Sequence, residues 1–243
     1  NGTTQLTGRS VLARDTNIGD AIKRNFALFS AGARYFWKNS IIYFSTAQAY
    51  RPVVFKDMQA NASFERVDTN LQDAKGWNTE LGWKGERNHI NWEVTFFDLI
   101  YKNRVGTIVQ YDEAGNYGTL RTNIGNSRNM GIELYTAYTL DVKNARIQIF
   151  NSTAYNHSRY VDASAVQSGS TVDISGNQVE SVPVWNIRSG VKVLIMKNYS
   201  FTLSHTYVDE SFADALNTVI PDKAGSIGIV PSYRIWDASI SAK

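Results

Sequence analysis

The amino-acid sequence predicts an all-β protein, an antiparallel transmembrane β-barrel segment of about nine to ten strands. Apolar and polar residues alternate with a period of two through most of the chain. The alternating segments run to about 10–14 residues, whereas a typical soluble strand has about 5–6 and a tilted membrane strand needs about 9–11. Tight turns also alternate with long polar connections, as they do at the two rims of outer-membrane barrels.

The first half of the chain contains two expected hairpins. Strands Arg24–Trp37 and Ile41–Tyr50 flank the tight turn at Lys38-Asn39-Ser40, although the second mixes polar and apolar residues on both faces. Strands Lys75–Gly85 and His89–Gln110 flank the turn at Glu86-Arg87-Asn88 and alternate cleanly. Their apolar positions are Trp77, Leu81, Trp83, Ile90, Trp92, Val94 and Phe96.

The second half continues the same rhythm with five more strands. Asn129–Leu140 and Ala145–Tyr160 flank the turn at Asp141–Asn144, and the pattern of the latter blurs after Ile149. Pro183–Leu194 and Tyr199–Val208 flank the turn at Met196-Lys197-Asn198, and both separate an apolar from a polar face. Ser232–Lys243 is the last strand, and residues 1–14 are expected to hold the end of another.

Between these hairpins lie four long polar connections, and aromatic residues gather near both strand ends. The connections are Arg51–Ala74, Tyr111–Met130, Tyr160–Val182 and Asp209–Val230. Rings with one polar atom favour the headgroup layer, so two aromatic bands are expected to border an apolar belt. The short-turn band comprises Trp37, Tyr43, Trp83, Trp92, Tyr138 and Tyr199, and the long-loop band Trp77, Tyr101, Trp185 and Tyr207.

Composition excludes several classes of function. The chain has no Cys and only three His, far apart, so thiolate chemistry, a zinc site and a His-based triad have no support. Asp57, Asp112, Glu113 and Glu210 are too dispersed to argue for a catalytic carboxylate pair. A net charge of +3 without a basic block gives no reason to expect nucleic-acid binding. We therefore expect no enzyme, no catalytic or metal-binding residue and no cofactor.

The polar strand face and the long loops are the regions where binding is expected. In a barrel the polar face lines a lumen, which forms either a solvated channel or a wall that grips an internal plug. Guanidinium groups bind carboxylates bidentately, so cationic loop residues suit a polyanionic ligand. The candidate substrate-binding residues are Arg51, Lys56, Arg66, Arg104, Arg121 and Arg128. They also have the alternatives of pairing with neighbouring acids or with anionic lipid.

Four segments give the chain a family resemblance. Phe44–Met58 (FSTAQAYRPVVFKDM) and Asn70–Gly85 (NLQDAKGWNTELGWKG) resemble the TonB-dependent outer-membrane receptors. Thr122–Leu134 (TNIGNSRNMGIEL) is similar to the family's strand-entry signature, with a Gly-hydrophobic-Glu core, and Val230–Asp237 (VPSYRIWD) to a late-barrel segment. Within the family, the Tyr50-Arg-Pro-Val region is most similar to ferric-dicitrate-type and siderophore receptors.

The resemblance implies a role, a location and partners. Residues 1–243 would form part of a receptor barrel of about 22 strands, without the plug domain and the terminal strands. The receptor would take up an iron chelate, such as ferric citrate or a siderophore, through the outer membrane of a Gram-negative bacterium. TonB would act through the missing plug, and outer-membrane lipid or lipopolysaccharide would surround the wall. No ligand contact is transferred residue by residue, because the family's contacts come partly from the plug.

Two other classes of function stay open at this point. A passive porin-like channel shares the aromatic bands and the strand length but has no plug. A soluble all-β ligand-binding domain is the other alternative, although its outward Trp and Tyr side chains would form large exposed apolar patches. We expect the segment to aggregate or to need detergent when it is expressed alone.

Overall fold

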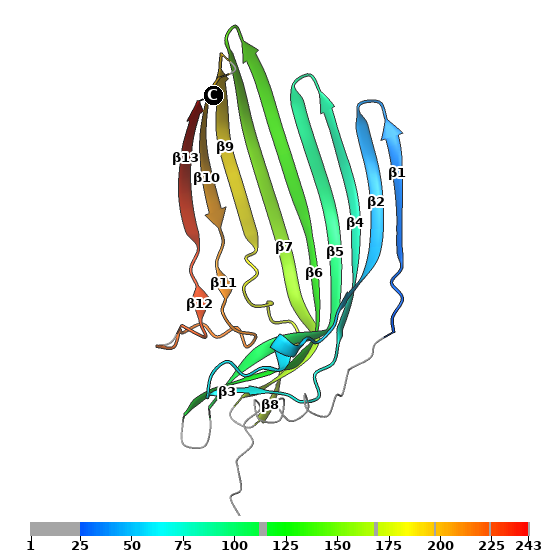
Figure 1. The fold of residues 1–243 in the computed structure, drawn as a ribbon, viewed down its shortest axis with the longest axis vertical. Helices are drawn as coiled ribbons and strands as arrows, with labels where there is room; N and C mark the ends of the chain where they lie inside the picture. Colours follow the sequence, from blue (N-terminus) through cyan, green and yellow to red (C-terminus); the bar gives the residue numbers. More distant parts are fainter. Residues whose placement is uncertain (1–24, 112–115, 168–169, 197, 224, 243) are drawn as a thin grey trace, which may run out of the picture.

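The computed structural model describes residues 25–111, 116–167, 170–196, 198–223 and 225–242, so the strand end expected within 1–14 lies outside it. Most of these residues form one curved sheet, antiparallel along the order β1-β2-β4-β5-β6-β7-β9-β10-β13 (Figure 1). The short strand β3 pairs parallel with β6, β8 pairs antiparallel with β7, and β11 and β12 form a separate two-stranded sheet. The all-β, antiparallel fold predicted from the alternation is confirmed. Among the described residues, β1 and β13 each pair with a single strand, so the sheet is open along both edges.

The strands join through tight turns at one end of the sheet and long connections at the other (Figure 1). The four turns lie where the sequence predicts them. The elements are β1 Ser30–Trp37, β2 Ser40–Arg51, η1 Phe55–Met58, β3 Glu65–Val67, β4 Ala74–Arg87, β5 Ile90–Tyr111, β6 Tyr117–Val142, β7 Ala145–Gln167, β8 Ser170–Asp173, β9 Trp185–Ile195, β10 Tyr199–Val208, β11 Ser211–Phe212, β12 Ile229–Val230 and β13 Tyr233–Ala242.

One expected connection is wrong. Tyr111–Met130 is largely strand, because β6 begins at Tyr117, and β7 likewise continues past Tyr160 to Gln167. The four short strands β3, β8, β11 and β12 are not predicted from the sequence either. The sequences of these segments lack a clean alternation of apolar and polar residues. The two-residue period therefore does not predict them.

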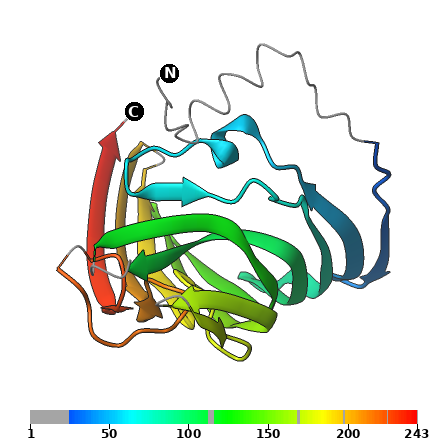
Figure 2. The ribbon, with the colours of Figure 1, turned by 90° about the horizontal axis from the view of Figure 1, so that it is seen from below.

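The middle strands are far longer than a bilayer requires. At about 3.3 Å per residue, the 26 residues of β6 extend about 85 Å, against a hydrocarbon core of about 30 Å. The excess forms a hairpin of β5 and β6 that bends over the long-loop end of the concave side, beside β3 and η1 (Figure 2). A buried apolar cluster lies there and fixes the bend; it contains Ile108, Ile124, Tyr160, Ala163, Ala165, Ile174, Val179 and Ala215.

The strand register sorts apolar side chains onto one face. Phe44 pairs with Leu81, Leu81 with Phe96, and Phe96 with Ile132, so one apolar row crosses four strands. Between 43 and 55 % of Phe44, Leu81 and Phe96 is exposed. A patch of this extent is rare on a monomer in water and is typical of a surface that meets lipid.

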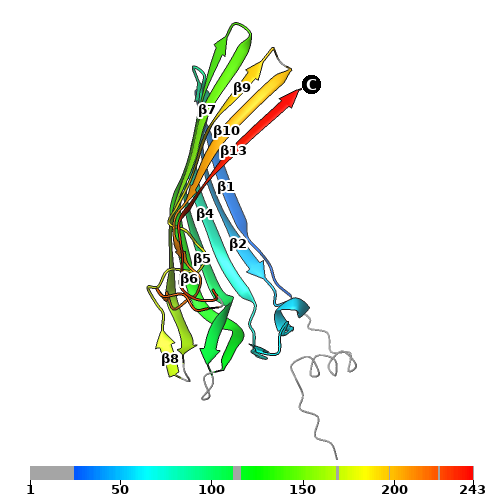
Figure 3. The same ribbon diagram turned by 90° about the vertical axis from the view of Figure 1, so that its left-hand side faces the viewer.

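The polar residues share the opposite, concave face. Lys84 pairs with Glu93, which pairs with Tyr135, and the same row continues through Ser152 to Arg188. The sheet is strongly curved in side view (Figure 3), and polar side chains from five neighbouring strands line one recess. The same parity includes all the residues expected to face a lumen, namely Glu80, Lys84, Asn91, Glu93, Glu133, Arg146, Gln148, Asn186, Arg188 and Lys192.

Eight of the ten aromatic residues expected in the two bands have the outward parity, and Tyr43 and Tyr101 do not. Tyr43 pairs with Gly82 on the concave face, and Tyr101 pairs with Gly76. The interpretation of these two tyrosines as band residues is wrong. Distance from a turn does not fix the face; parity does, because successive side chains of a strand point to opposite sides.

Three concave-face glycines lie directly beneath aromatic rings of a neighbouring strand. Register pairs Tyr43 with Gly82, Phe97 with Gly131, and Phe150 with Gly190. A Cβ atom at any of these glycines would approach the ring to 2.2–2.6 Å. Each ring therefore lies flat over the strand, which keeps the inner wall thin and covers the bare glycine backbone.

We expect Gly131→Ala to destabilise the folded barrel by about 1–3 kcal/mol, because overpacking forces the ring and the backbone apart. The new Cβ would lie 2.1 Å from the Tyr155 carbonyl oxygen and 2.5 Å from Phe97 Cζ. Urea titration of the full-length protein in lipid vesicles measures the change. Gly32→Ala is the matched control, since its nearest atom would be 3.3 Å away. Equal midpoints for both variants would contradict the packing argument.

Candidate functional site

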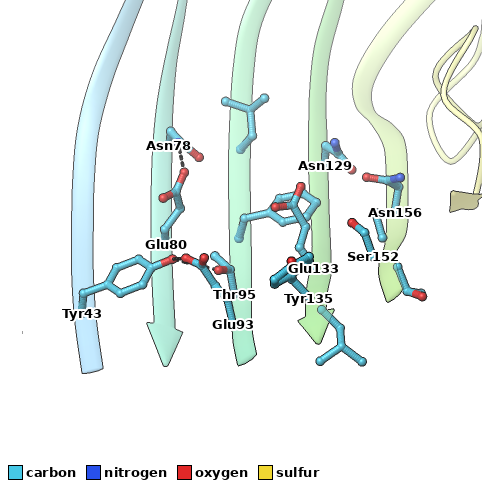
Figure 4. Close-up of a pocket in the computed structure, with 15 residues that line it drawn as sticks. Tyr43, Asn78, Glu80, Glu93, Thr95, Asn129, Glu133, Tyr135, Ser152 and Asn156 are labelled. Carbon is cyan, nitrogen blue, oxygen red and sulfur yellow. Dashed lines mark hydrogen bonds between the residues drawn. The ribbon is translucent and has the colours of Figure 1, made fainter. Parts of the chain in front are cut away.

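The candidate site is a recess of about 680 Å³ on the concave face, lined by residues of β2, β4, β5, β6 and β7 (Figure 4). Cross-strand pairing sets its composition, since Glu80 pairs with Phe97 and Glu133 pairs with Thr95. Its polar lining comprises Tyr43, Asn78, Glu80, Glu93, Thr95, Asn129, Glu133, Tyr135, Ser152, Thr153 and Asn156. We call this the acidic recess.

Two carboxylates of the acidic recess are held by neutral donors. The Tyr43 hydroxyl lies 3.1 Å from Glu93 Oε1, to which it donates, and 2.8 Å from Thr95 Oγ1. Asn78 Nδ2 donates to Glu80 Oε1 over 2.7 Å. Figure 4 shows these bonds on neighbouring strands. The side chains are thereby oriented without being neutralised.

The acidic recess carries more negative charge than its surroundings balance. Within the part of the chain that the structure describes, no Lys or Arg lies within 4.0 Å of Glu80, Glu93 or Glu133. The nearby Lys84 places Nζ over the Tyr43 ring, 5.6 Å from its centroid. Asn129 Oδ1 is buried there without a hydrogen-bond donor. A cationic partner that also donates hydrogen bonds suits this lining.

The recess offers carboxylates together with neutral hydrogen-bonding side chains. In the described ranges, no group of three or more acidic or imidazole side chains is placed to hold a metal ion. The carboxylates sit on three separate strands, with Glu80 on β4, Glu93 on β5 and Glu133 on β6. The chemistry that the arrangement supports is electrostatic binding.

The predicted candidate Arg121 has a structural task in the loops. Its Nη1 donates to the carbonyl oxygens of Lys56, Asp57 and Gln59 at 3.1–3.3 Å, and its Nη2 pairs with Glu65. One guanidinium on β6 thus holds the chain around η1 and β3 onto the bent hairpin. Its donors are occupied by the protein itself.

Two further candidates are also paired within the loops. Arg51 binds Asp57 at 2.7 Å. Burial pushes the pKa of Asp57 upward, but the Val54 N–H and the Arg51 guanidinium outweigh it and hold that pKa below its usual value. Arg104 pairs with Glu180 at 3.2 Å, and Tyr160 donates its hydroxyl to the same carboxylate. Burial, followed by the Glu180 charge, raises the pKa of Tyr160, so it remains a donor.

The last three candidates have different surroundings. Arg128 lies on the outward face, where its Nε and Nη2 each bind Asp98 at 2.8 Å. Lys56 and Arg66 are exposed, and the described structure gives their side chains no hydrogen bond or ion pair. The six residues are therefore not one cluster. Lys56 and Arg66 are the two whose cationic groups are free for a ligand.

Sequence reasoning identified the parity of the recess glutamates but not their grouping. Glu80, Glu93 and Glu133 all have the polar parity of their strands. Their proximity depends on the register of β4, β5 and β6. This register places Thr95 opposite Gly82 on one side and opposite Glu133 on the other, so the three glutamates come to the same level of the sheet. The four tight turns, each of fixed length, were the available signal, because a hairpin turn sets the register of its two strands.

We expect Arg121→Gln to loosen the chain around η1, because about 2 kcal/mol of charge-assisted hydrogen bonding is lost. Hydrogen–deuterium exchange of residues 53–67 in the full-length protein should be faster, while strands β9 and β10 keep their protection. Arg66→Gln is the control, because Arg66 lies on strand β3 and its side chain has no partner among the described residues. Unchanged exchange in Arg121→Gln would refute the anchoring role.

Comparison with known proteins extends these observations. The family model described as TonB dependent receptor-like, beta-barrel matches residues 3–243. Among solved structures, the chain is similar to the siderophore receptor PiuA from Acinetobacter baumannii, with a TM-score of 0.62 and 21% identity over 90% of this chain and 30% of that one. The ferric citrate transporter FecA in the unliganded form has a TM-score of 0.62 and 21% identity over 88% of this chain and 30% of that one.

The name of a third similar structure gives a different transported substance. The copper transporter OprC matches with a TM-score of 0.62 and 11% identity, over 88% of this chain and 31% of that one. At these identities the likeness shows the fold. The chain spans about a third or less of the length of each of these structures.

Proposed function

The chain belongs to the TonB-dependent receptor-like β-barrel family, and from that premise we propose that it is a wall segment of an outer-membrane receptor for active uptake of an iron chelate. The observation that carries the proposal is the two-faced sheet, with exposed apolar rows outside and a charged recess inside. The open edges at β1 and β13 support further strands on both sides, in a barrel of about 22. Its place is the outer membrane of a Gram-negative bacterium.

The acidic recess is proposed to grip a plug domain encoded elsewhere in the protein. Its three carboxylates face the inside of the barrel, and in the described structure none of them has a Lys or Arg within 4.0 Å. A basic plug segment would supply the charge and the donors that Glu133 and Asn129 lack in the described structure. TonB would act on that plug, so the grip would have to be strong enough to close the pore and weak enough to release.

We expect the double variant Glu93→Gln/Glu133→Gln to leak, because a neutral recess binds a cationic plug less tightly. A loss of about 1.4 kcal/mol corresponds to about a tenfold higher leak. Sensitivity of a producing strain to vancomycin, which is too large for ordinary porins, reports it. Glu86→Gln is the control on the same face of β4, outside the recess. If the double variant does not leak, the recess does not contribute to plug binding.

The ligand is proposed to be an anionic iron chelate, ferric citrate or a siderophore. The names of two similar structures, a siderophore receptor and a ferric citrate transporter, support this choice. The unpaired cations Lys56 and Arg66 support an anionic ligand at the loops. Arg51, Arg104 and Arg121 would order the loops, and Arg128 would face the lipid.

We expect Lys56→Glu/Arg66→Glu to lower the affinity for the chelate about tenfold or more, because two attractive charges become repulsive. Uptake of radiolabelled ferric citrate and of ferric siderophores into a receptor-deleted strain carrying the full-length gene measures it. Lys223→Glu, an exposed lysine in another loop, is the control. Uptake that persists without TonB would indicate a passive channel, and uptake of copper alone would refute the iron chelate.

Lipopolysaccharide is the proposed neighbour of the outward face at the long-loop end. Lys75 and Lys102 pair directly across β4 and β5 with outward parity, and like charges in that position destabilise a sheet. They border a groove of about 450 Å³ whose apolar lining includes Phe26, Trp77 and Ile100. Lipopolysaccharide carries phosphate groups next to its acyl chains. The phosphates would meet the two lysines, and the acyl chains would meet the apolar lining of the groove.

A further inference from the structure

A second outward recess, of about 810 Å³, lies at the opposite rim between two tight turns. The β1–β2 turn contributes Lys38 and Asn39, and the β4–β5 turn contributes Arg87 and Asn88. Tryptophan side chains line the recess between the two turns. We call it the turn recess; its lining is Trp37, Lys38, Asn39, Ser40, Trp83, Arg87, Asn88, Ile90 and Trp92. The strand residues among these have the outward parity.

The wall of the turn recess is built by close packing. The rings of Trp83 and Trp92 are 5.4 Å apart between centroids, with their planes tilted by 59°. Trp92 lies against Gly85, where a Cβ atom would approach Trp92 Cζ2 to 2.5 Å and Asn39 O to 2.6 Å. Trp92 Nε1 is buried and has no acceptor among the described residues. The absence of a side chain at Gly85 therefore lets the Trp92 ring lie close against β4.

The rim of the turn recess is cationic and unneutralised. No acidic residue lines it, and in the described part of the chain neither Lys38 nor Arg87 has a carboxylate within 4.0 Å. Lys38 Nζ lies 5.8 Å from the Trp37 ring centroid, a contact that leaves its hydrogen-bond donors open. Two cations and two asparagine amides at the turns thus sit above an apolar tryptophan wall.

We propose that the turn recess binds an anionic phospholipid of the periplasmic leaflet, with the phosphate between Lys38 and Arg87 and the glycerol and upper acyl chain against Trp83 and Trp92. Short turns mark the periplasmic rim of an outer-membrane barrel, so the recess opens at headgroup level. From the rim toward the membrane centre, the protein presents hydrogen-bond donors, then aromatic surface, then the apolar belt. A phospholipid presents its phosphate, its glycerol backbone and its acyl chains in the same order. The proposal rests on the membrane setting proposed above.

The test uses the full-length receptor in detergent micelles, titrated with dioleoylphosphatidylglycerol and, separately, with dioleoylphosphatidylcholine. Native mass spectrometry counts bound lipids. We expect Lys38→Gln/Arg87→Gln to weaken binding of the tightest phosphatidylglycerol about thirtyfold, since each cation near a membrane surface contributes about a fivefold step. Lys143→Gln, at the β6–β7 turn and outside the recess, is the matched control and should bind as the unchanged receptor does.

A second variant separates shape from charge. Gly85→Ala keeps both cations but displaces Trp92, and it should also weaken phosphatidylglycerol while the heat-modifiable gel shift confirms a folded barrel. Undiminished binding in the double variant, equal loss in Lys143→Gln, or equal affinity for phosphatidylcholine would each overturn the proposal. If soluble glycerol phosphate displaces phosphatidylglycerol at an equal concentration, the recess is a general anion site, and the proposal of a lipid site is overturned. Chelate uptake should be unchanged in these variants, so a failed uptake experiment concerns the proposed function alone.

Discussion

Satisfaction of backbone hydrogen bonds is the constraint on which the rest of this structure depends. A strand in hydrocarbon has no water to bond its N–H and C=O groups, so each must pair with a neighbouring strand. Among the described strands, β2, β4, β5, β6, β7, β9 and β10 each have a paired neighbour on both sides in the main sheet. Continuous pairing fixes the register, and the register decides which side chains share a face. The acidic recess and the apolar rows are consequences of the same ladder.

The thin inner wall follows from that ladder as well. An aromatic side chain on the concave face would normally stand up from the sheet and narrow the barrel. Here Tyr43, Phe97 and Phe150 each lie over a glycine of the next strand, so the rings cover backbone instead of filling space. Because its ring lies over Gly82, Tyr43 also places its hydroxyl where it donates a hydrogen bond to Glu93. Packing of the wall and preparation of the recess are thus one arrangement.

The sequence predicts the fold well where apolar and polar residues alternate and fails where they do not. The turns near Lys38, Asn88 and Lys143 and the strands around them were predicted closely, since alternation is strong there. The start of β6 at Tyr117 was missed because that part of the hairpin lies outside the membrane belt. The fate of the loop cations was also beyond prediction: Arg121 and Arg104 meet partners 56–76 residues away, and only the tertiary structure determines such pairs.

Cations in this protein separate into those that hold the structure and those left for other molecules. Arg51, Arg104 and Arg121 bind carboxylates or carbonyls of the loops, so their charges are neutralised where ordering requires it. Lys38 and Arg87 at one rim, and Lys75 and Lys102 at the other, face outward without such partners in the described structure. Unpaired cations that border apolar grooves gain most from anions that carry their own apolar part, and lipids on both sides of a membrane have that composition.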